Sequence, residues 1–411
     1  MKNALLLLLS LSLFSSSCKK DSPLPEPAPI NLNQKAKQLV AGDNRFGLEL
    51  FKQMSDTGIA SKNLMISPLS VSMALSMTYN GAKNRTKEAF DNTLHFDGLT
   101  LEELNQSVKE LTGALLSVDP KITLDIANSI WYKKGFVVES DFINRNKTFY
   151  SAEIQELNFG NPQSVNTIND WVDEKTNHKI EKIIDQLNPE DRMLLINAIY
   201  FKGDWRNRFN SSQTASKPFY LENGQQVSVQ MMQTTGNYPY FENNMLDALE
   251  MPYGRGNFSM VVLLPKEGYK VADILTSLNS ETWETWQDEF VDIDEVPVSF
   301  PKFKFRYEKS LKEVLRTLGL SEAFDETADF TGINKDGGLL ISEVKHKTYI
   351  NVDEEGTEAA AVTAVTVGTT SAGPGYPFVA DHPFVFIIKE KYTHAILFIG
   401  VLANPNLGGD E

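Results

Sequence analysis

The chain has 411 residues, of which 41% are apolar and 23% charged, ordinary proportions for a globular protein. These values exclude a disordered, collagen-like or coiled-coil chain. Lys plus Arg number 39 and Asp plus Glu number 54, which gives a formal net charge of −15. A chain this acidic lacks the clustered Lys and Arg that follow a phosphate backbone, so we expect no nucleic-acid partner.

The first 17 residues have the pattern of a secretory signal peptide. A charged start at Lys2 precedes an apolar run from Ala4 to Phe14 and then three serines. The run is too short to span a bilayer. Cys18, the only cysteine, follows the serines directly and resembles a bacterial lipoprotein processing site. We expect a signal peptide over 1–17 and lipidation at Cys18; a plain signal peptide with an incidental cysteine is the alternative.

This reading predicts secretion across the inner membrane and a lipid anchor in the outer membrane or at the cell surface, with extracellular release as the alternative. Lys19 in place of Asp argues against retention at the inner membrane. Residues 18–35 carry the lipidated cysteine and a Pro-rich tether, because prolines stand at every second position from Pro23 to Pro29. No internal repeat or second linker follows, so residues 36–411 are expected to form a single domain.

Helical spacing of apolar residues predicts four helices, with Ser67 as a cap and Pro68 at the first helical position of the second. The helices are expected over Ala36–Met54, Ser67–Gly81, Leu101–Leu116 and Ile168–Ile184. Four further segments have strand patterns: Thr123–Trp131, Leu194–Phe201, Asp247–Leu264 and Val296–Phe305. A fifth segment, Pro383–Ala403, is expected to form two strands joined by a turn. This order indicates one large mixed domain with helices first and strands later.

Catalytic motifs are mostly missing from the sequence. None of the five histidines stands in a His-Glu-x-x-His pattern, and neither a Gly-x-Ser-x-Gly elbow nor a phosphate-binding loop occurs. We therefore expect no catalytic residue, metal site or cofactor. A triad assembled from distant residues remains the alternative, which keeps a hydrolase among the hypotheses.

The segment Val352–Ser371 has an unusual composition. After Gly356 it contains small and β-branched residues and no proline. One face at the strand period consists of Thr357, Ala359, Ala361, Thr363, Val365 and Val367. A segment without proline can pair on both edges as a central strand. The alternatives are an ordinary edge strand or a Thr/Ala-rich linker.

Several motifs then occur in an order that resembles the serpin (serine protease inhibitor) family over about residues 36–406. The motifs are Asn63–Ser70, Gly81–Lys83, Asn197–Trp205, His346, Glu354–Ala361, Pro383–Ile388 and Phe398–Pro405. The resemblance implies an α+β serpin fold with three β-sheets, about nine helices and an exposed reactive-centre loop. It also implies a monomer that is not an enzyme but inhibits a serine-type endopeptidase as a suicide substrate, forming a covalent complex.

The resemblance assigns roles to particular residues. The hinge of the loop would be Glu354, Glu355, Gly356, Thr357, Glu358, Ala359, Ala360 and Ala361. The shutter beneath the sheet opening would contain Asn63, Ser67, Pro68, Ser70, Asn197 and His346. The breach at the top of the sheet would contain Lys302, Trp205 and Glu354, with Lys302 and Glu354 as an ion pair.

The usual loop length of the family places the scissile bond between Thr370 and Ser371, with Thr369 and Ala372 as neighbouring candidates. A small β-branched residue suits the shallow primary pocket of an elastase-like protease. Tyr376 is a more distant candidate that would imply a chymotrypsin-like target. A papain-like cysteine protease as target, and a non-inhibitory surface-binding lipoprotein of serpin fold, are the alternative functions.

Overall fold

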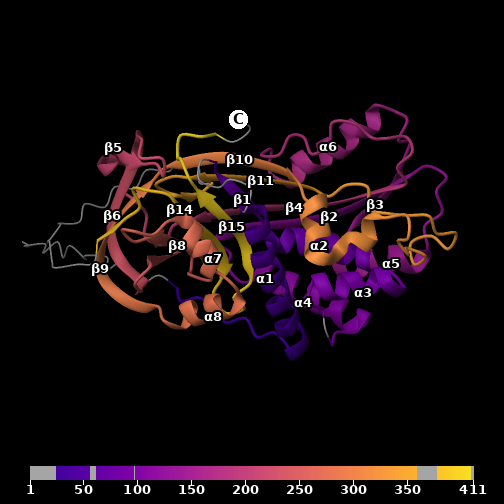
Figure 1. The fold of residues 1–411 in the computed structure, drawn as a ribbon, viewed down its shortest axis with the longest axis horizontal. Coiled ribbons are helices and arrows are strands. Elements are labelled where there is room, and N and C mark those ends of the chain that lie inside the picture. The colour runs from indigo at the N-terminus through magenta and orange to yellow at the C-terminus, as the bar shows by residue number, and fades with distance from the viewer. Residues whose placement is uncertain (1–24, 56–61, 97, 359–376, 409–411) are drawn as a thin grey trace, which may run out of the picture.

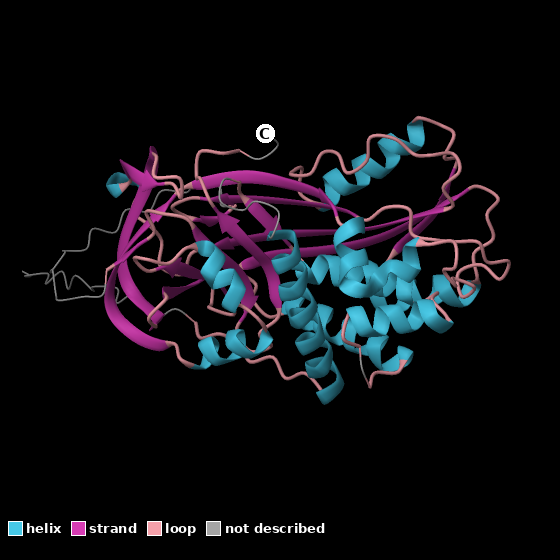
Figure 2. Cartoon of the chain, in the orientation of Figure 1, coloured by secondary structure: helices cyan, strands magenta, loops and turns pink. Residues whose placement is uncertain are grey.

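The computed structural model describes residues 25–55, 62–96, 98–358 and 377–408. Helices and strands are both abundant, which confirms the expected α+β class, and nine α-helices occur within the described residues. The helices are α1 (Gln34–Ser55), α2 (Pro68–Tyr79), α3 (Asn84–Thr93), α4 (Leu101–Ser117), α5 (Ser140–Tyr150), α6 (Gln163–Lys175), α7 (Val271–Ser277), α8 (Ser280–Asp288) and α9 (Lys312–Leu315). As Figure 2 shows, several of these helices gather beneath one end of the long strands.

The strands lie in two hydrogen-bonded systems. In chain order they are β1 (Leu64–Ile66), β2 (Ile122–Lys133), β3 (Glu153–Leu157), β4 (Met193–Asp204), β5 (Ala215–Tyr220), β6 (Gln226–Glu242), β7 (Leu246–Pro252), β8 (Phe258–Pro265), β9 (Val291–Pro301), β10 (Phe303–Ser310), β11 (Lys345–Val352), β12 (Gly356–Thr357), β13 (Phe378–Val379), β14 (Phe384–Glu390) and β15 (Ile396–Leu402).

The six-stranded sheet has the order β10-β11-β12-β4-β2-β3 and positions most of the predicted site. Its pairs are antiparallel except β2 with β3. Figure 1 shows α6 on one side of β2 and β4, and α2 to α5 on the other. On the α6 side, Trp131 of β2 meets Trp171 of α6 edge to face, with ring centroids 6.0 Å apart. The sheet is therefore covered on both faces at this end.

The second system follows the order β1-β15-β14-β8-β7-β6-β9-β13, with β5 added to β6. Strand β6 is shared between two groups of strands. It pairs with β7 only at its end, from Tyr240 to Glu242, and with β5 and β9 along the rest of its length. The path thus divides into two sheets joined at β6, which gives three sheets with the six-stranded one.

Helix α2 begins where the sequence predicts and lies entirely inside the protein. The Ser67 hydroxyl accepts a hydrogen bond from the Ser70 N–H at 3.2 Å, and Pro68 occupies the first helical position. All residues from Pro68 to Tyr79 are buried except Ala74. A helix that is buried on all its faces must be surrounded by protein, and α2 contacts both β4 of the six-stranded sheet and α1.

The prediction of a helix over Ile168–Ile184 is wrong about where the helix ends. Helix α6 stops at Lys175, and the following residues form an irregular connection to β4. Asn177 and His178 have φ angles of 49° and 61°, in the left-handed region that ends a helix. The apolar spacing continued beyond Lys175 because Ile183 and Ile184 are buried in the same cluster as the helix.

Two segments expected as strands are each two strands. Asp247–Leu264 contains β7 and β8, separated by a turn in which Gly254 and Gly256 have positive φ. Val296–Phe305 contains the end of β9 and the start of β10, which belong to different sheets. The chain changes sheet at Lys302, whose N–H still donates to the Gln230 carbonyl at 2.8 Å. The remaining three strand segments are confirmed in β2, β4 and the β14–β15 pair.

The described part of the predicted tether lies against the body of the protein. The Ala28 N–H donates to Asn257 Oδ1 at 2.9 Å, and Asn257 Nδ2 donates back to the Ala28 carbonyl at 2.6 Å. The Tyr392 hydroxyl donates to the Pro27 carbonyl. Within the described residues, no helix is both long and apolar enough to span a membrane.

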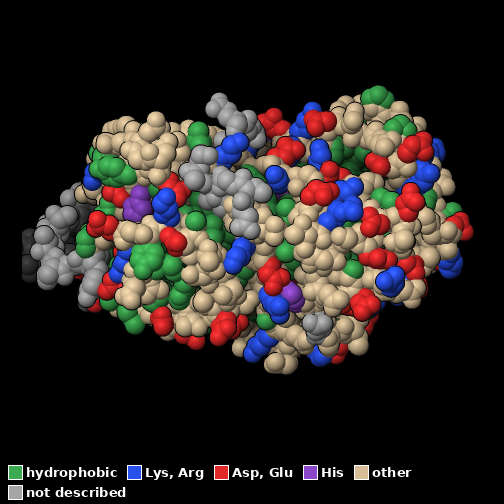
Figure 3. Space-filling model, viewed as in Figure 1, with side chains coloured by type: hydrophobic (Ala, Val, Ile, Leu, Met, Phe, Trp, Pro, Cys, Tyr) green, Lys and Arg blue, Asp and Glu red, His purple; other side chains and the backbone are tan. Residues whose placement is uncertain are grey.

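Charged side chains of both signs are interspersed on the face shown in Figure 3. The net charge of −15 is therefore not gathered into one acidic patch on this described surface.

Candidate functional site

The predicted hinge enters the six-stranded sheet with its first residues. Gly356 and Thr357 form β12, which pairs with Asp204 and Gly203 of β4 and with Val352 of β11. In the order of hydrogen-bonded strands, β11 and β4 are not direct neighbours, since β12 stands between them. The two-residue strand β12 therefore lies between two much longer strands, at the place where a longer strand could pair with both.

Gly356 is required by the close approach of two backbones. A Cβ atom at this position would collide with the Gly203 carbonyl oxygen and lie 2.7 Å from Asp204 Cα. The chain before β12 is also fixed by backbone bonds. The Trp205 N–H donates to the Glu355 carbonyl at 2.7 Å. Only a residue without a side chain fits between these partners.

The Thr357 side chain points into a buried aromatic group. Its hydroxyl lies 2.6 Å from the Tyr253 hydroxyl, and the Tyr253 ring stacks on Trp205 with centroids 4.3 Å apart. The Trp205 indole N–H donates to the Asp353 carbonyl at 3.0 Å. Burial raises the pKa of Tyr253 far above its ordinary value, so the hydroxyl remains neutral and able to donate. The predicted breach residue Trp205 thus contacts the hinge directly at Glu355 and, through Tyr253, at Thr357.

Lys302 and Glu354 are in contact, as the resemblance implies. Lys302 Nζ lies 2.6 Å from Glu354 Oε2, and the Thr214 hydroxyl donates to Glu354 Oε1 at 2.7 Å. Burial raises the pKa of Glu354, but the hydrogen bonds from Lys302 and Thr214 outweigh it and hold the pKa below its ordinary value. The carboxylate is therefore ionised and joins the start of the hinge to the junction of β9 and β10.

Four of the predicted shutter residues form one hydrogen-bonded cluster beneath β4 and β11. The Ser67 N–H donates to His346 Nε2 at 3.0 Å, and the Ser70 hydroxyl donates to Asn197 Oδ1. Burial lowers the pKa of His346 to about 4, so the imidazole is neutral at pH 7. A neutral Nε2 is also what the Ser67 N–H requires as an acceptor.

The cluster continues through residues that the sequence did not single out. Asn197 Nδ2 donates to Asn128 Oδ1 at 2.6 Å, and Asn128 Nδ2 donates to the Tyr150 carbonyl at 2.8 Å. Asn128 lies on the inner face of β2, opposite Asn197 of β4. A polar residue on the buried face of an otherwise apolar strand was the signal that could have identified it.

Two predicted shutter residues have different surroundings. Asn63 holds the C-terminal segment: its Oδ1 accepts from the Ala403 and Asn404 N–H groups at 2.9 and 3.0 Å. Pro68 contributes packing instead of hydrogen bonds, because it fills the space beside Gly47 of α1. The structure therefore separates Asn63 from the cluster and places Pro68 next to it as a helix-starting residue.

The remaining predicted site residues fall into two groups. Glu355 and Glu358 are within the described part, and Glu358 is treated below. The lipidation site Cys18, the hinge residues Ala359, Ala360 and Ala361, and the scissile pair Thr370 and Ser371 lie outside the described residues.

The described histidines are dispersed over the fold. Their ring nitrogens contact Glu49, Asp173, the Ser67 N–H, Asp381 and Gln287 in five separate places. Within the described residues, no group of three or more metal-ligating side chains is arranged to hold an ion.

Comparisons with known proteins agree with the resemblance. The model of the family described as Serpin (serine protease inhibitor) matches residues 41–405. An uncharacterized serpin-like protein of Thermococcus kodakarensis is 37% identical, over 90% of this chain and 87% of that protein. The leukocyte elastase inhibitor of Bos taurus is 34% identical, over 90% of this chain and 100% of that protein.

The crystal structure of the thermophilic serpin tengpin in its native state superimposes with a TM-score of 0.82. It is 33% identical and covers 93% of this chain and 97% of that chain. The structural match confirms the serpin fold expected from the sequence, and the family match extends over nearly all the described residues. The chain therefore belongs to the serpin family, whose members are generally serine protease inhibitors.

Proposed function

We propose that this chain inhibits a serine endopeptidase as a suicide substrate. The serine Oγ of the protease attacks the carbonyl carbon of the scissile residue, the C–N bond breaks, and the next residue leaves as an amine that takes up the proton of the serine hydroxyl. The remaining ester joins protease and inhibitor while the freed hinge extends β12 between β11 and β4. The observation that carries this proposal is the position of β12, paired on both edges between these strands.

The existing register indicates how far the hinge could extend. Thr357 lies opposite Gly203, so continuing the antiparallel register would place residues 358–367 opposite Lys202 to Met193 of β4. The residues on the same face as buried Thr357 would be Ala359, Ala361, Thr363, Val365 and Val367. They are small or β-branched and fit a buried strand face. Ladder hydrogen bonds of about 0.5–1.5 kcal/mol each would favour the extended form.

An elastase-like protease is the target that the sequence favours. Thr370, the expected scissile residue, is small and β-branched. The similarity to a leukocyte elastase inhibitor supports the same class. Small residues at 369 and 372 would preserve this preference if cleavage occurred at a neighbouring bond, whereas cleavage at Tyr376 would indicate a chymotrypsin-like target.

The chain is also proposed to act as a monomer anchored by lipid at Cys18, in the outer membrane or at the cell surface. Lipidation would add a mass to the N-terminal peptide, and Cys18→Ser should move the protein from the membrane fraction to the soluble fraction. An unmodified Cys18 in the mature protein, or a Cys18→Ser variant that stays with the membrane, would contradict the anchor.

The central experiment challenges the full chain with a panel of serine and cysteine proteases. We expect an elastase-like enzyme to form a complex that survives boiling in denaturant, and N-terminal sequencing of the released fragment to begin at Ser371. Thr357→Arg should convert the inhibitor into a substrate, because a charged side chain has no partner beside Tyr253. Thr357→Ser, which keeps the hydroxyl, is the matched control.

The alternatives give different results in the same experiment. Cleaved protein with fully active protease across the panel would favour the non-inhibitory surface-binding lipoprotein. A complex with a papain-like enzyme alone would replace the serine protease as target. Turnover of peptide substrates without cleavage of the chain itself would indicate a hydrolase.

A further inference from the structure

Glu358, the residue after β12, has an unusual combination of conformation and burial. Its φ angle is +61°, in the left-handed region that non-glycine residues rarely adopt, and only 8% of its surface is exposed. Its N–H nevertheless donates to the Asn351 carbonyl of β11 at 2.7 Å. The backbone therefore keeps one strand-like bond at Glu358 while leaving the extended conformation at the same residue.

A lysine from a different part of the fold contacts this carboxylate. Lys179 Nζ lies 2.9 Å from Glu358 Oε1, and the Glu358 side chain is 6% exposed. Burial raises the pKa of Glu358, while Lys179 lowers it in part. A carboxylate at this depth is costly without a cation beside it; Lys179 is in direct contact with Glu358, and Tyr200 and Lys202 also favour the charged form.

The backbone that carries Lys179 is fixed to the end of α6. The Lys179 N–H donates to the Thr176 carbonyl at 3.1 Å, and the Ile180 N–H donates to the Thr176 hydroxyl at 3.0 Å. The same hydroxyl donates to the Val172 carbonyl of α6 at 2.8 Å. The ammonium group therefore extends from an anchored turn.

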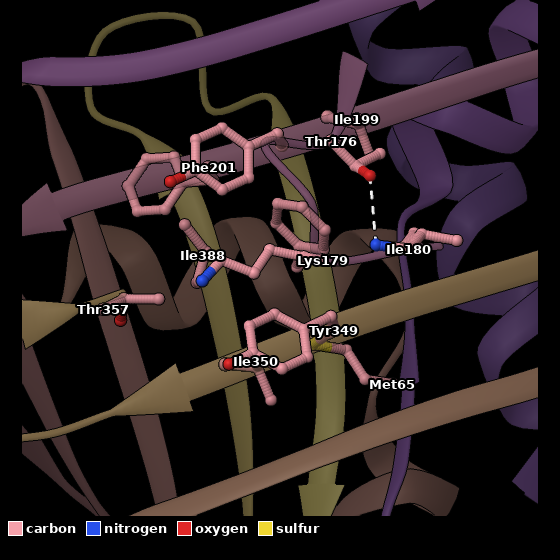
Figure 4. A pocket seen from close by; sticks show the side chains of 12 residues that line it. Met65, Thr176, Lys179, Ile180, Ile199, Phe201, Tyr349, Ile350, Thr357 and Ile388 are labelled. Atoms are coloured by element: carbon pink, nitrogen blue, oxygen red, sulfur yellow. Dashed lines mark hydrogen bonds between the residues drawn. The ribbon is translucent and has the colours of Figure 1, made fainter. Parts of the chain in front are cut away.

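The turn lies over the line along which β12 would continue. A cavity of about 20 Å³, roughly the size of one water molecule, is lined on one side by Tyr200 and Phe201 of β4 and on the other by Tyr349 and Ile350 of β11. Figure 4 shows the Lys179 side chain extending between residues of these two strands toward Thr357. The ammonium also lies 5.7 Å from the centre of the Tyr349 ring.

We infer that Lys179 is a positioning residue that holds Glu358 as the turning point of the hinge and thereby slows extension of β12 beyond Thr357. The inference rests on the proposed function and adds to it a restraint from the α6–β4 connection. The restraint acts on the resting molecule, before any protease is bound.

The ion pair can act in this way only if it differs between the two states of the hinge. Extension of β12 requires Glu358 to move from φ +61° to the negative φ of a strand. This change swings the Cα–Cβ bond, while Lys179 stays attached to α6. A contact made in the resting state and lost or weakened on extension stabilises the resting state. Removing the charge of Lys179 should therefore release the hinge.

The first test needs no protease. In Lys179→Met, which keeps the length of the side chain, hydrogen exchange of the Phe201 amide, on the edge of β4 that an extended β12 would cover, should be on the order of tenfold slower than in wild type. Exchange of the Ile196 amide in β4 should be unchanged. Lys182→Met is the matched control, because Lys182 belongs to the same connection but pairs with exposed Asp185. Lys179→Arg should behave as wild type. Glu358→Gln serves as the second variant if Lys179→Met does not fold.

The second test uses the protease identified for the wild-type chain. Lys179→Met should lose inhibitory activity faster than wild type during incubation without protease, and the exchanged pair Lys179→Glu with Glu358→Lys should restore the wild-type rate. A wild-type chain that forms no protease complex would overturn the proposed function but leave the exchange experiment decisive. If Lys179→Met matched Lys182→Met in both tests, or extended its hinge more slowly than wild type, the restraint would be overturned.

Discussion

Asn197 of β4 and His346 of β11 lie at the same level of the strand register that begins at β12. The partners of Thr357 are Gly203 and Val352, and six steps along each strand lead to Asn197 and His346. Both side chains belong to the cluster with Ser67 and Ser70. A strand continued from Thr357 would place residue 363 between them.

Thr363→Arg should therefore prevent the hinge from extending past the shutter. A guanidinium group between Asn197 and neutral His346 would be buried without a carboxylate partner. We expect the protease to cleave this variant and to escape, with a stoichiometry of inhibition raised roughly tenfold or more. Thr363→Ser keeps a small hydroxyl and should inhibit as wild type does. Normal inhibition by the Arg variant would show that residue 363 does not enter this level.

His346 predicts a loss of stability in acid. Its pKa is about 4 in the folded protein because burial disfavours the charged form, against an ordinary value of 6.5. The unfolded chain therefore takes up a proton first, and stability present above pH 6.5 is lost as the pH falls toward 4. The free energy of unfolding should fall by on the order of 3 kcal/mol over this range. In His346→Gln this fall should be absent. Urea unfolding at pH 7.5 and pH 4 measures this loss, and an equal dependence of the free energy of unfolding on pH in both proteins would contradict the assignment.

The buried carboxyl group of Asp43 should make the protein less stable as the pH rises. Asp43 is buried in α1 beside Tyr150, and its Oδ1 accepts from the Ser72 hydroxyl at 2.5 Å. Burial raises its pKa to about 7, and the Ser72 bond lowers it only in part. Stability is complete below the ordinary pKa of 3.8 and is lost as the pH rises through 7.

Asp43→Asn should therefore be more stable than wild type at pH 8, by roughly 2 to 4 kcal/mol, and similar to it at pH 4. The Asn side chain can still accept from Ser72. Asp273→Asn, at an exposed capping position of α7, provides a control. A pH-independent effect of Asp43→Asn would indicate altered packing and not titration.

The Lys302–Glu354 pair should contribute about 1 kcal/mol of coupling energy. Glu354 has a side chain that is 14% exposed, but Lys302 is 37% exposed, so water screens part of the attraction. A double-mutant cycle of Lys302→Met and Glu354→Gln measures this energy. Because the pKa of Glu354 is lowered, the coupling should be present at pH 7 and disappear as the pH falls below its ordinary value of 4.5. A coupling that does not weaken as the pH falls would have another cause.

Local signals made much of the fold predictable. Ser67 and Pro68 fixed the start of α2 because capping and a preset φ act within one helical turn. The strands β2 and β4 were predictable from residue types that suit a sheet. The end of α6 was missed, although Asn177 was an available signal because asparagine adopts the left-handed conformation that ends a helix more readily than most residues.

The site was predictable mainly where a motif lay in one stretch. Lys302 and Glu354 are 52 residues apart in the sequence, and only the resemblance suggested their contact. Tyr253 was missed because its stacking on Trp205 depends on how two sheets meet. Asp43 was missed because a charged residue in an amphipathic helix is normally on the solvent side.

The bonds between Ala28 and Asn257 limit the length of chain that could connect the folded protein to a membrane anchor. For a lipid at Cys18, only the stretch from residue 18 to residue 28 is left to span the gap, about 35 Å when fully extended. The turn between β7 and β8 would then lie within about 35 Å of the lipid anchor. With such an anchor, a protease would have to reach the inhibitor close to the bilayer.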